Sequence, residues 1–157
     1  MEKGNKAKKT LLIEWLARLA VAIVFVVNVK CAFQFLINPE GSMGSFELFG
    51  EVGMATIRGI AVTFLMWNAT YPLVILNPLR HHVLFAVVLA QQLIGLIGES
   101  YILFTIGVEH VLLREAILRF IAFDGFGLVI MALTYIVLMV HRARLKCQPQ
   151  ANKQLID

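Results

Sequence analysis

Four charged side chains stand inside apolar stretches of the sequence, where they would face hydrocarbon rather than water. They are Lys30, Arg58, Glu99 and Asp124. A carboxylate near the middle of a membrane costs about 2.5–3.5 kcal/mol on insertion scales, so Asp124 needs a partner from another helix. Two acids and two bases could neutralise one another. Such groups either hold helices in register or form a functional site.

Other polar residues extend this pattern. Gln92 precedes Glu99 by seven residues and therefore shares its helix face, with Gly95 near the same stripe. Arg119 opens the segment that contains Asp124, although Glu115, four residues earlier, offers it a local partner. The candidate ligand-binding site or intramembrane charge cluster therefore comprises Lys30, Arg58, Gln92, Glu99, Arg119 and Asp124.

The composition indicates that membrane-spanning helices must position these side chains. Of the 157 residues, 59% are hydrophobic and only 15% are charged, and the mean hydropathy is +0.79. A soluble domain is about 45–50% apolar and about 25% charged. We therefore predict an all-α integral membrane protein. The basic residues gather at the chain ends, which points to membrane orientation and away from a nucleic-acid partner.

Four apolar runs predict four transmembrane helices at about residues 11–37, 54–76, 83–107 and 117–140. A basic segment, residues 1–10, precedes this membrane domain, and a basic tail, residues 141–157, follows it. The Lys and Arg residues outside the spans lie mainly in these ends and in the second loop, whereas the first loop carries only acidic charge. We therefore expect a four-helix bundle in a cell membrane with both termini in the cytoplasm.

The helical rise of about 1.5 Å per residue brings the charged groups to similar depths. Arg58 would lie about 6 Å and Asp124 about 10 Å below the outer surface, with Lys30 and Glu99 in the same half of the bilayer. We expect Asp124 to pair with Arg58 or Lys30, and Glu99 to take the other base. The alternative is a polar cavity, open toward the outer side, that holds a ligand head group or relays protons.

Motifs for enzyme chemistry are missing from the sequence. It contains no nucleophile–base arrangement and no glycine-rich phosphate loop, and its histidines match no metal-ligand spacing. The two cysteines, Cys31 and Cys147, form no CxxC motif, which argues against a thiol-redox enzyme. We therefore expect neither a catalytic residue nor a metal site.

Several short motifs resemble those of DoxX-like small membrane proteins. The first helix and the turn after it resemble that family at Arg18-Leu19, Phe25, Lys30, Pro39 and Phe46. Arg58-Gly59, and Arg119 with Asp124-Gly125, are similar to Arg-Gly and Asp-Gly pairs in related families. The resemblance implies four helices with both termini inside. It also implies an accessory membrane subunit, linked in some members to quinone-dependent oxidation.

Three functions are compatible with these observations. We favour a non-catalytic membrane protein, either a subunit or a small-ligand binder. The first alternative is a redox or enzyme subunit that acts on a lipophilic substrate such as a quinone. The second is a proton-coupled carrier, which would need to form oligomers because four spans are few for a monomeric carrier. Besides the lipid bilayer, the expected partner is another membrane protein or a second copy of the chain.

The predicted topology can be checked with a membrane-impermeant thiol reagent. Ser45→Cys lies in the first loop and should react in intact cells, whereas native Cys147 in the basic tail should not. The reverse labelling pattern would contradict this topology and would move the charged groups to the inner leaflet.

Overall fold

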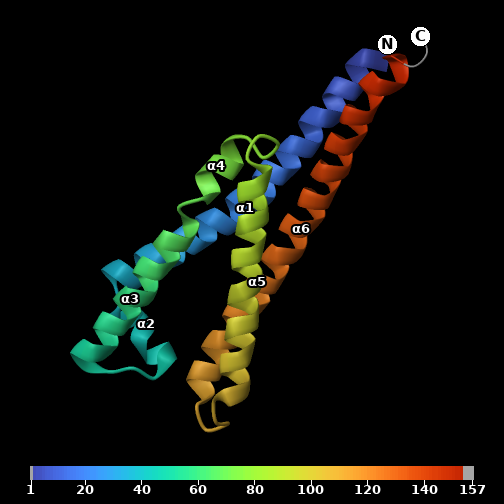
Figure 1. Cartoon of the computed structure of the whole chain (residues 1–157). Helices are drawn as coiled ribbons and strands as arrows, with labels where there is room; N and C mark the ends of the chain where they lie inside the picture. Colours follow the sequence, from blue (N-terminus) through green and yellow to red (C-terminus); the bar gives the residue numbers. More distant parts are fainter. Residues whose placement is uncertain (1, 154–157) are drawn as a thin grey trace.

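Figure 1 shows the fold as a computed structural model, which describes the backbone of residues 2–153 and the side chains of residues 10–144. The described part of the chain is helical and contains no strand, which confirms the all-α prediction. In chain order the elements are α1 (Glu2–Ile37), α2 (Glu40–Met43), the 3₁₀ helix η1 (Gly44–Phe46), α3 (Gly50–Asn68), α4 (Tyr71–Leu76), α5 (His82–Thr105) and α6 (Val111–Lys153).

Four helical stretches are long and apolar enough to cross a membrane, as predicted. They are Thr10–Ile37, Gly50–Leu76, His82–Thr105 and Val111–Arg144. The second and fourth begin earlier than expected, and the helix of the fourth continues well beyond residue 140. The side chains of residues 1–9 and 145–157, which make up most of the predicted basic ends, lie outside the described part.

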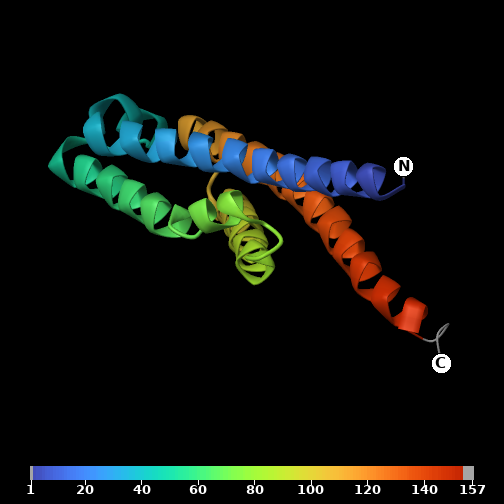
Figure 2. The same ribbon diagram turned by 90° about the horizontal axis from the view of Figure 1, so that it is seen from above.

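The helices form two pairs. α1 packs along α3, and α5 packs along α6. The pairs are joined where α1 crosses α6 and where the short helix α4 contacts both α1 and α5. Both termini lie toward the same end of the structure (Figures 1 and 2). This arrangement leaves the α1–α3 pair facing the α5–α6 pair over the half of the structure away from the termini.

Two apolar clusters hold the pairs together. Nearer the termini, Val24 of α1, Phe85 of α5 and Met131 of α6 are buried in one cluster. At the other end, Phe35 of α1 packs with Ile57 of α3 in a second cluster. Each cluster draws its members from one face of each helix, which is how apolar stripes of helical period are buried. The polar residues of interest lie between these two clusters.

The second span is broken between α3 and α4. The Asn68 side chain donates to the Phe64 backbone oxygen at 2.8 Å, which satisfies the last turn of α3 from within. Pro72 then lies in the first turn of α4, where its missing N–H costs no helical hydrogen bond. The break allows the buried ring of Tyr71 to approach α5.

Glu47 and His110 join two loops at the end away from the termini. His110 Nδ1 lies 2.5 Å from Glu47 Oε2, and Glu47 Oε1 accepts the Leu113 backbone N–H at 3.3 Å. Glu47 has a φ of 55°, a left-handed conformation that is uncommon for residues other than glycine. These contacts of the Glu47 carboxylate therefore hold the η1 turn against the start of α6.

The loop contact has a definite dependence on pH. The hydrogen bond to Glu47 raises the pKa of His110 above its ordinary 6.5, and the same bond lowers the pKa of Glu47 below its ordinary 4.5. The stabilisation of the folded state by protonated His110 is fully present below pH 6.5 and is lost as the pH rises through the raised pKa of His110. Stability from Glu47 is present above pH 4.5 and is lost as the pH falls through its lowered pKa.

We expect Glu47→Gln to lower the thermal unfolding midpoint most between pH 4.5 and pH 6.5, where both partners are charged. The difference from the wild type should shrink once His110 is neutral. Thermal unfolding of detergent-solubilised protein over a pH series measures this difference in midpoint. Glu51→Gln serves as a control, because Glu51 is an exposed acidic residue. A difference that is equal at every pH would contradict this assignment.

Candidate functional site

A directed chain of hydrogen bonds runs through the middle of the bundle. The Tyr71 hydroxyl donates to Gln92 Oε1 at 3.2 Å, and Gln92 Nε2 donates to Asp124 Oδ1 at 2.7 Å. Gln92 is 0% and Asp124 is 8% exposed. Because Tyr71 occupies the amide oxygen of Gln92, the amide NH₂ group is turned toward Asp124. The chain therefore links α4, α5 and α6 through polar groups that lipid could not satisfy.

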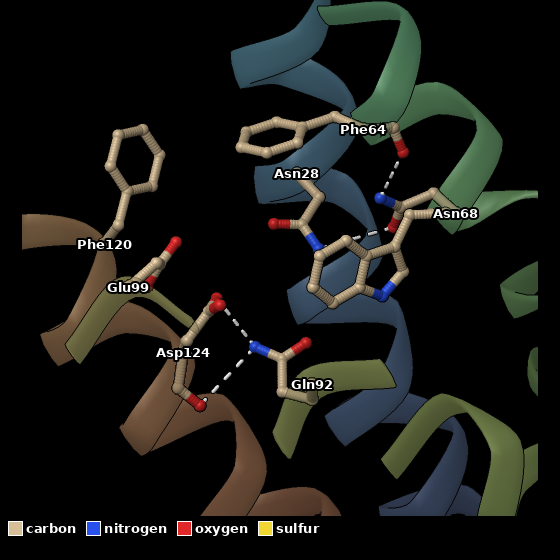
Figure 3. Close-up of a pocket in the computed structure, with 8 residues that line it drawn as sticks. Asn28, Phe64, Asn68, Gln92, Glu99, Phe120 and Asp124 are labelled. Carbon is tan, nitrogen blue, oxygen red and sulfur yellow. Dashed lines mark hydrogen bonds between the residues drawn. The ribbon is translucent and has the colours of Figure 1, made fainter. Parts of the chain in front are cut away.

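A small cavity of about 20 Å³ adjoins Asp124, with Gln92 and Glu99 of α5 on its wall (Figure 3). On the opposite side lie Asn28 of α1 and Asn68 of α3, whose side chains are joined by a hydrogen bond of 3.4 Å. The cavity thus lies between the two helix pairs. A cavity needs about 10–15 Å³ to hold one water molecule, so this one has room for a single water-sized particle.

Aromatic rings form the rest of the cavity wall. Phe64 and Trp67 come from α3, and Phe120 comes from α6 (Trp67 is drawn without a label in Figure 3). These rings form the apolar part of the wall beside the polar groups. Apolar surroundings lower the local dielectric and so strengthen the electrostatic interactions in the cavity.

Among the described residues no basic side chain lines this cavity, although two carboxylates do. One oxygen of Asp124 accepts from Gln92, while the Glu99 Oε2 atom is buried and has no hydrogen-bond partner among the described residues. The cavity is therefore acidic and has unused acceptor capacity.

The expected stripe on the third span is confirmed. Gln92 is buried, and Gln92 and Glu99 both face the cavity, with Gly95 between them. A Cβ atom on Gly95 would collide with the Trp67 ring and would lie 3.1 Å from Asp124 Oδ2. Only glycine leaves room at this position for a ring from the opposite helix pair. The glycine thereby lets α3 cover the site.

The expected pairing of Asp124 and Glu99 with Lys30 and Arg58 is wrong. Both bases are exposed, and among the described residues neither forms an ion pair. The reason is rotation about the helix axes, because each residue turns the helix by about 100°. Lys30 follows the cavity-facing Asn28 by two residues, so it projects almost oppositely.

Arg58 and Arg119 also lie outside the cavity because of the rotation of their helices. Arg58 directly follows the buried Ile57 and points away from the α1–α3 contact. Arg119 is also exposed, and its Nε donates to the Glu115 backbone oxygen at 3.3 Å rather than pairing with the Glu115 carboxylate. The predicted cluster therefore divides into an acidic, amide-lined cavity and three separate surface cations.

Sequence reasoning did not place Asn28, Asn68, Trp67 or Tyr71 in the site. The two asparagines carry a usable signal, since an uncharged amide inside an apolar span also needs a partner. Trp67 and Tyr71 gave no such signal, because aromatic residues serve equally well in a core or against lipid. The places of Trp67 and Tyr71 in the site depend on the break between α3 and α4.

Comparisons with known proteins provide no relative. No family model, curated protein or solved structure matches the chain.

The residues of the cavity are suited to binding rather than to covalent chemistry. Carboxylate and amide oxygens accept hydrogen bonds and attract positive charge. Among the described residues, no three His, Cys, Asp or Glu side chains come together as a metal-ligand group. The arrangement can bind one small guest that donates hydrogen bonds or carries positive charge.

The close approach at Gly95 predicts different results for two glycines of the same helix. Gly95→Ala should destabilise the protein by about 1–3 kcal/mol, because the added methyl group forces Trp67 or Asp124 to move. Gly98→Ala is the matched control, since a Cβ there meets nothing within 4 Å. Thermal unfolding in detergent should show a lower midpoint for Gly95→Ala only. Equal midpoints would show that Trp67 does not cover Gly95.

Proposed function

We propose that this integral membrane protein binds a water-sized, positively charged species in the cavity beside Asp124 and Glu99. The species is either a proton or a small monovalent cation. The observation that carries the proposal is the presence of two carboxylates on one cavity between the helix pairs, with no base among its described lining residues. Uncompensated charge in a membrane interior is costly, so the pair requires neutralisation from outside the chain.

The hydrogen bonds around Asp124 support binding at a specific place. Gln92 donates to Asp124 Oδ1, and Asp124 Oδ2 accepts no hydrogen bond within the described part of the chain. Glu99 Oε2 is buried and has no hydrogen-bond partner there either. A guest between these oxygens would receive acceptors from α5 and α6 and would complete their hydrogen bonding.

The size of the cavity limits the guest. A volume of about 20 Å³ accommodates a hydrated proton or a bare monovalent cation. Pockets for larger organic ligands are about 300–1,000 Å³. A quinone ring therefore does not fit this cavity, and the redox alternative gains no support from it.

We further propose that both termini face the cytoplasm of a cell membrane, on the basis of the basic chain ends and the acidic first loop. An accessory role beside another membrane protein, as in the DoxX-like proteins that the chain resembles, is compatible with a bound proton or cation. A stoichiometric partner in a gentle pull-down would support that role. The carrier alternative would instead require cation or proton flux in reconstituted vesicles.

The proposed ligand can be tested by thermal unfolding in detergent at constant ionic strength. One series varies the pH in a buffer whose cation is the bulky N-methylglucamine, and the other replaces this cation with sodium, potassium or ammonium at constant pH. A ligand at 100 times its Kd stabilises the folded state by about 2.7 kcal/mol. The midpoint should therefore rise in one series, which identifies the ligand as a proton or as a cation.

Glu99→Gln and Asp124→Asn should each abolish this rise, whereas the exposed control Glu51→Gln should retain it. The loop contact of Glu47 and His110 contributes equally to all of these proteins, so the comparison cancels it. If both cavity variants respond like the wild type in both series, the proposed function is wrong.

A further inference from the structure

A second and much larger cavity lies at the end of the bundle away from the termini. Its volume is about 380 Å³, within the range of small-molecule pockets of about 300–1,000 Å³. It is an open pocket lined by the last turns of α1, the short helices α2 and η1, and the first turns of α6. We refer to it as the outer pocket.

The apolar wall of the outer pocket is a cluster of phenylalanine rings. Phe35 lies 5.7 Å from Phe46 and 6.4 Å from Phe120 between ring centroids, and Phe46 lies 6.1 Å from Phe120. Phe120 also lines the small acidic cavity, so one ring separates the two spaces. An acyl chain or a glycerol backbone could pack against these rings.

The polar wall contains Arg119, which is the one charged side chain among the described residues that line the pocket. Arg119 uses Nε to donate to the Glu115 backbone oxygen, and the described residues give its guanidinium no carboxylate partner. The two terminal NH₂ groups therefore keep their donors available in a geometry that matches phosphate or carboxylate oxygens. Gln34, Ser42 and Ser45 add neutral hydrogen-bonding groups to the same pocket.

The position of the outer pocket along the helices corresponds to a layer of lipid head groups. Arg119 lies eight residues after the start of α6, or about 12 Å along that helix, whose spanning stretch of 34 residues is longer than the hydrocarbon layer requires. Glu47 is the acidic side chain nearest in sequence to Ser45 and Phe46. It contacts His110 and is not among the residues that line the pocket.

We propose that the outer pocket binds an anionic membrane lipid, with the head-group phosphate on Arg119 and the adjoining apolar part against Phe35, Phe46 and Phe120. The two cavities then take ligands of opposite charge. This proposal is independent of the one for the acidic cavity, and either can fail alone.

The test uses the full chain in nanodiscs of phosphatidylcholine that contain a minor fraction of phosphatidylglycerol, followed by native mass spectrometry of the released protein. The wild type should retain phosphatidylglycerol in preference to phosphatidylcholine. Arg119→Gln should reduce that preference about 10-fold, as expected for the loss of a charge-assisted contact. Arg58→Gln removes an exposed arginine that does not line the pocket, so it should retain the wild-type preference.

Two further measurements keep the result decisive. Ser45→Trp fills the pocket without changing its charge and should also abolish retention, which covers the case in which Arg119→Gln fails to fold. Cys31 lines the pocket, so in a Cys147→Ser background phosphatidylglycerol should slow its alkylation and phosphatidylcholine should not.

The proposal is overturned if Arg119→Gln and Ser45→Trp both retain phosphatidylglycerol like the wild type, or if Arg58→Gln loses it equally. It is also overturned if inorganic phosphate protects Cys31 as well as the lipid does, which would indicate a site for a free anion. Retention of a neutral isoprenoid quinone in place of the anionic lipid would likewise reject it and would favour a redox role.

Discussion

A carboxylate inside a membrane span must be hydrogen-bonded or neutralised, and Asp124 obtains its side-chain hydrogen bond from Gln92. That bond requires α5 and α6 to lie side by side at this depth. A donor on the other side of Gln92 supports this orientation, because it satisfies the amide oxygen while the NH₂ group faces the carboxylate. Tyr71 is that donor, and the break between α3 and α4 places it there. The interruption of the second span is thus part of the site.

The same constraint explains the small residue on α5. A polar chain in a bundle must be covered on its open side, and the α1–α3 pair supplies the Trp67 ring for this purpose. Coverage is possible only where the facing helix presents no side chain, which is the position of Gly95. Farther out, Arg114 donates to the Leu103 and Ile106 oxygens at the end of α5, and Glu47 bonds to His110. The Arg114 contacts hold α6 to the end of α5, and the contact of Glu47 with His110 joins the two helix pairs.

The sequence alone predicted the number of spans, the helical class and the polar stripe of α5, but it did not predict which charges would meet. Gln92 and Glu99 belong to one helix, so their shared face follows directly from helical geometry. The depth of Lys30 and Arg58 also follows from counting residues. Their direction depends on how each helix is rotated in the bundle, and most of their neighbours along each helix are apolar. Rotation is set by packing at residues such as Ile57, and periodicity in a uniformly apolar span does not reveal it.

The resulting distribution of charge is unusual for salt bridges that merely hold helices in register. Such pairs would place acids against bases inside the bundle, whereas here Asp124 and Glu99 line one cavity and Lys30 and Arg58 project outward. Lys30 and Arg58 lie within two to three turns of their helix ends, so their long side chains can extend to the head-group layer. Asp124 and Glu99 have shorter side chains and line one cavity, whose apolar wall consists of the Phe64, Trp67 and Phe120 rings. The bases can thus be solvated at the membrane surface, whereas the two acids share a cavity with no base among its described lining residues, and this asymmetry is the reason for the binding function proposed above.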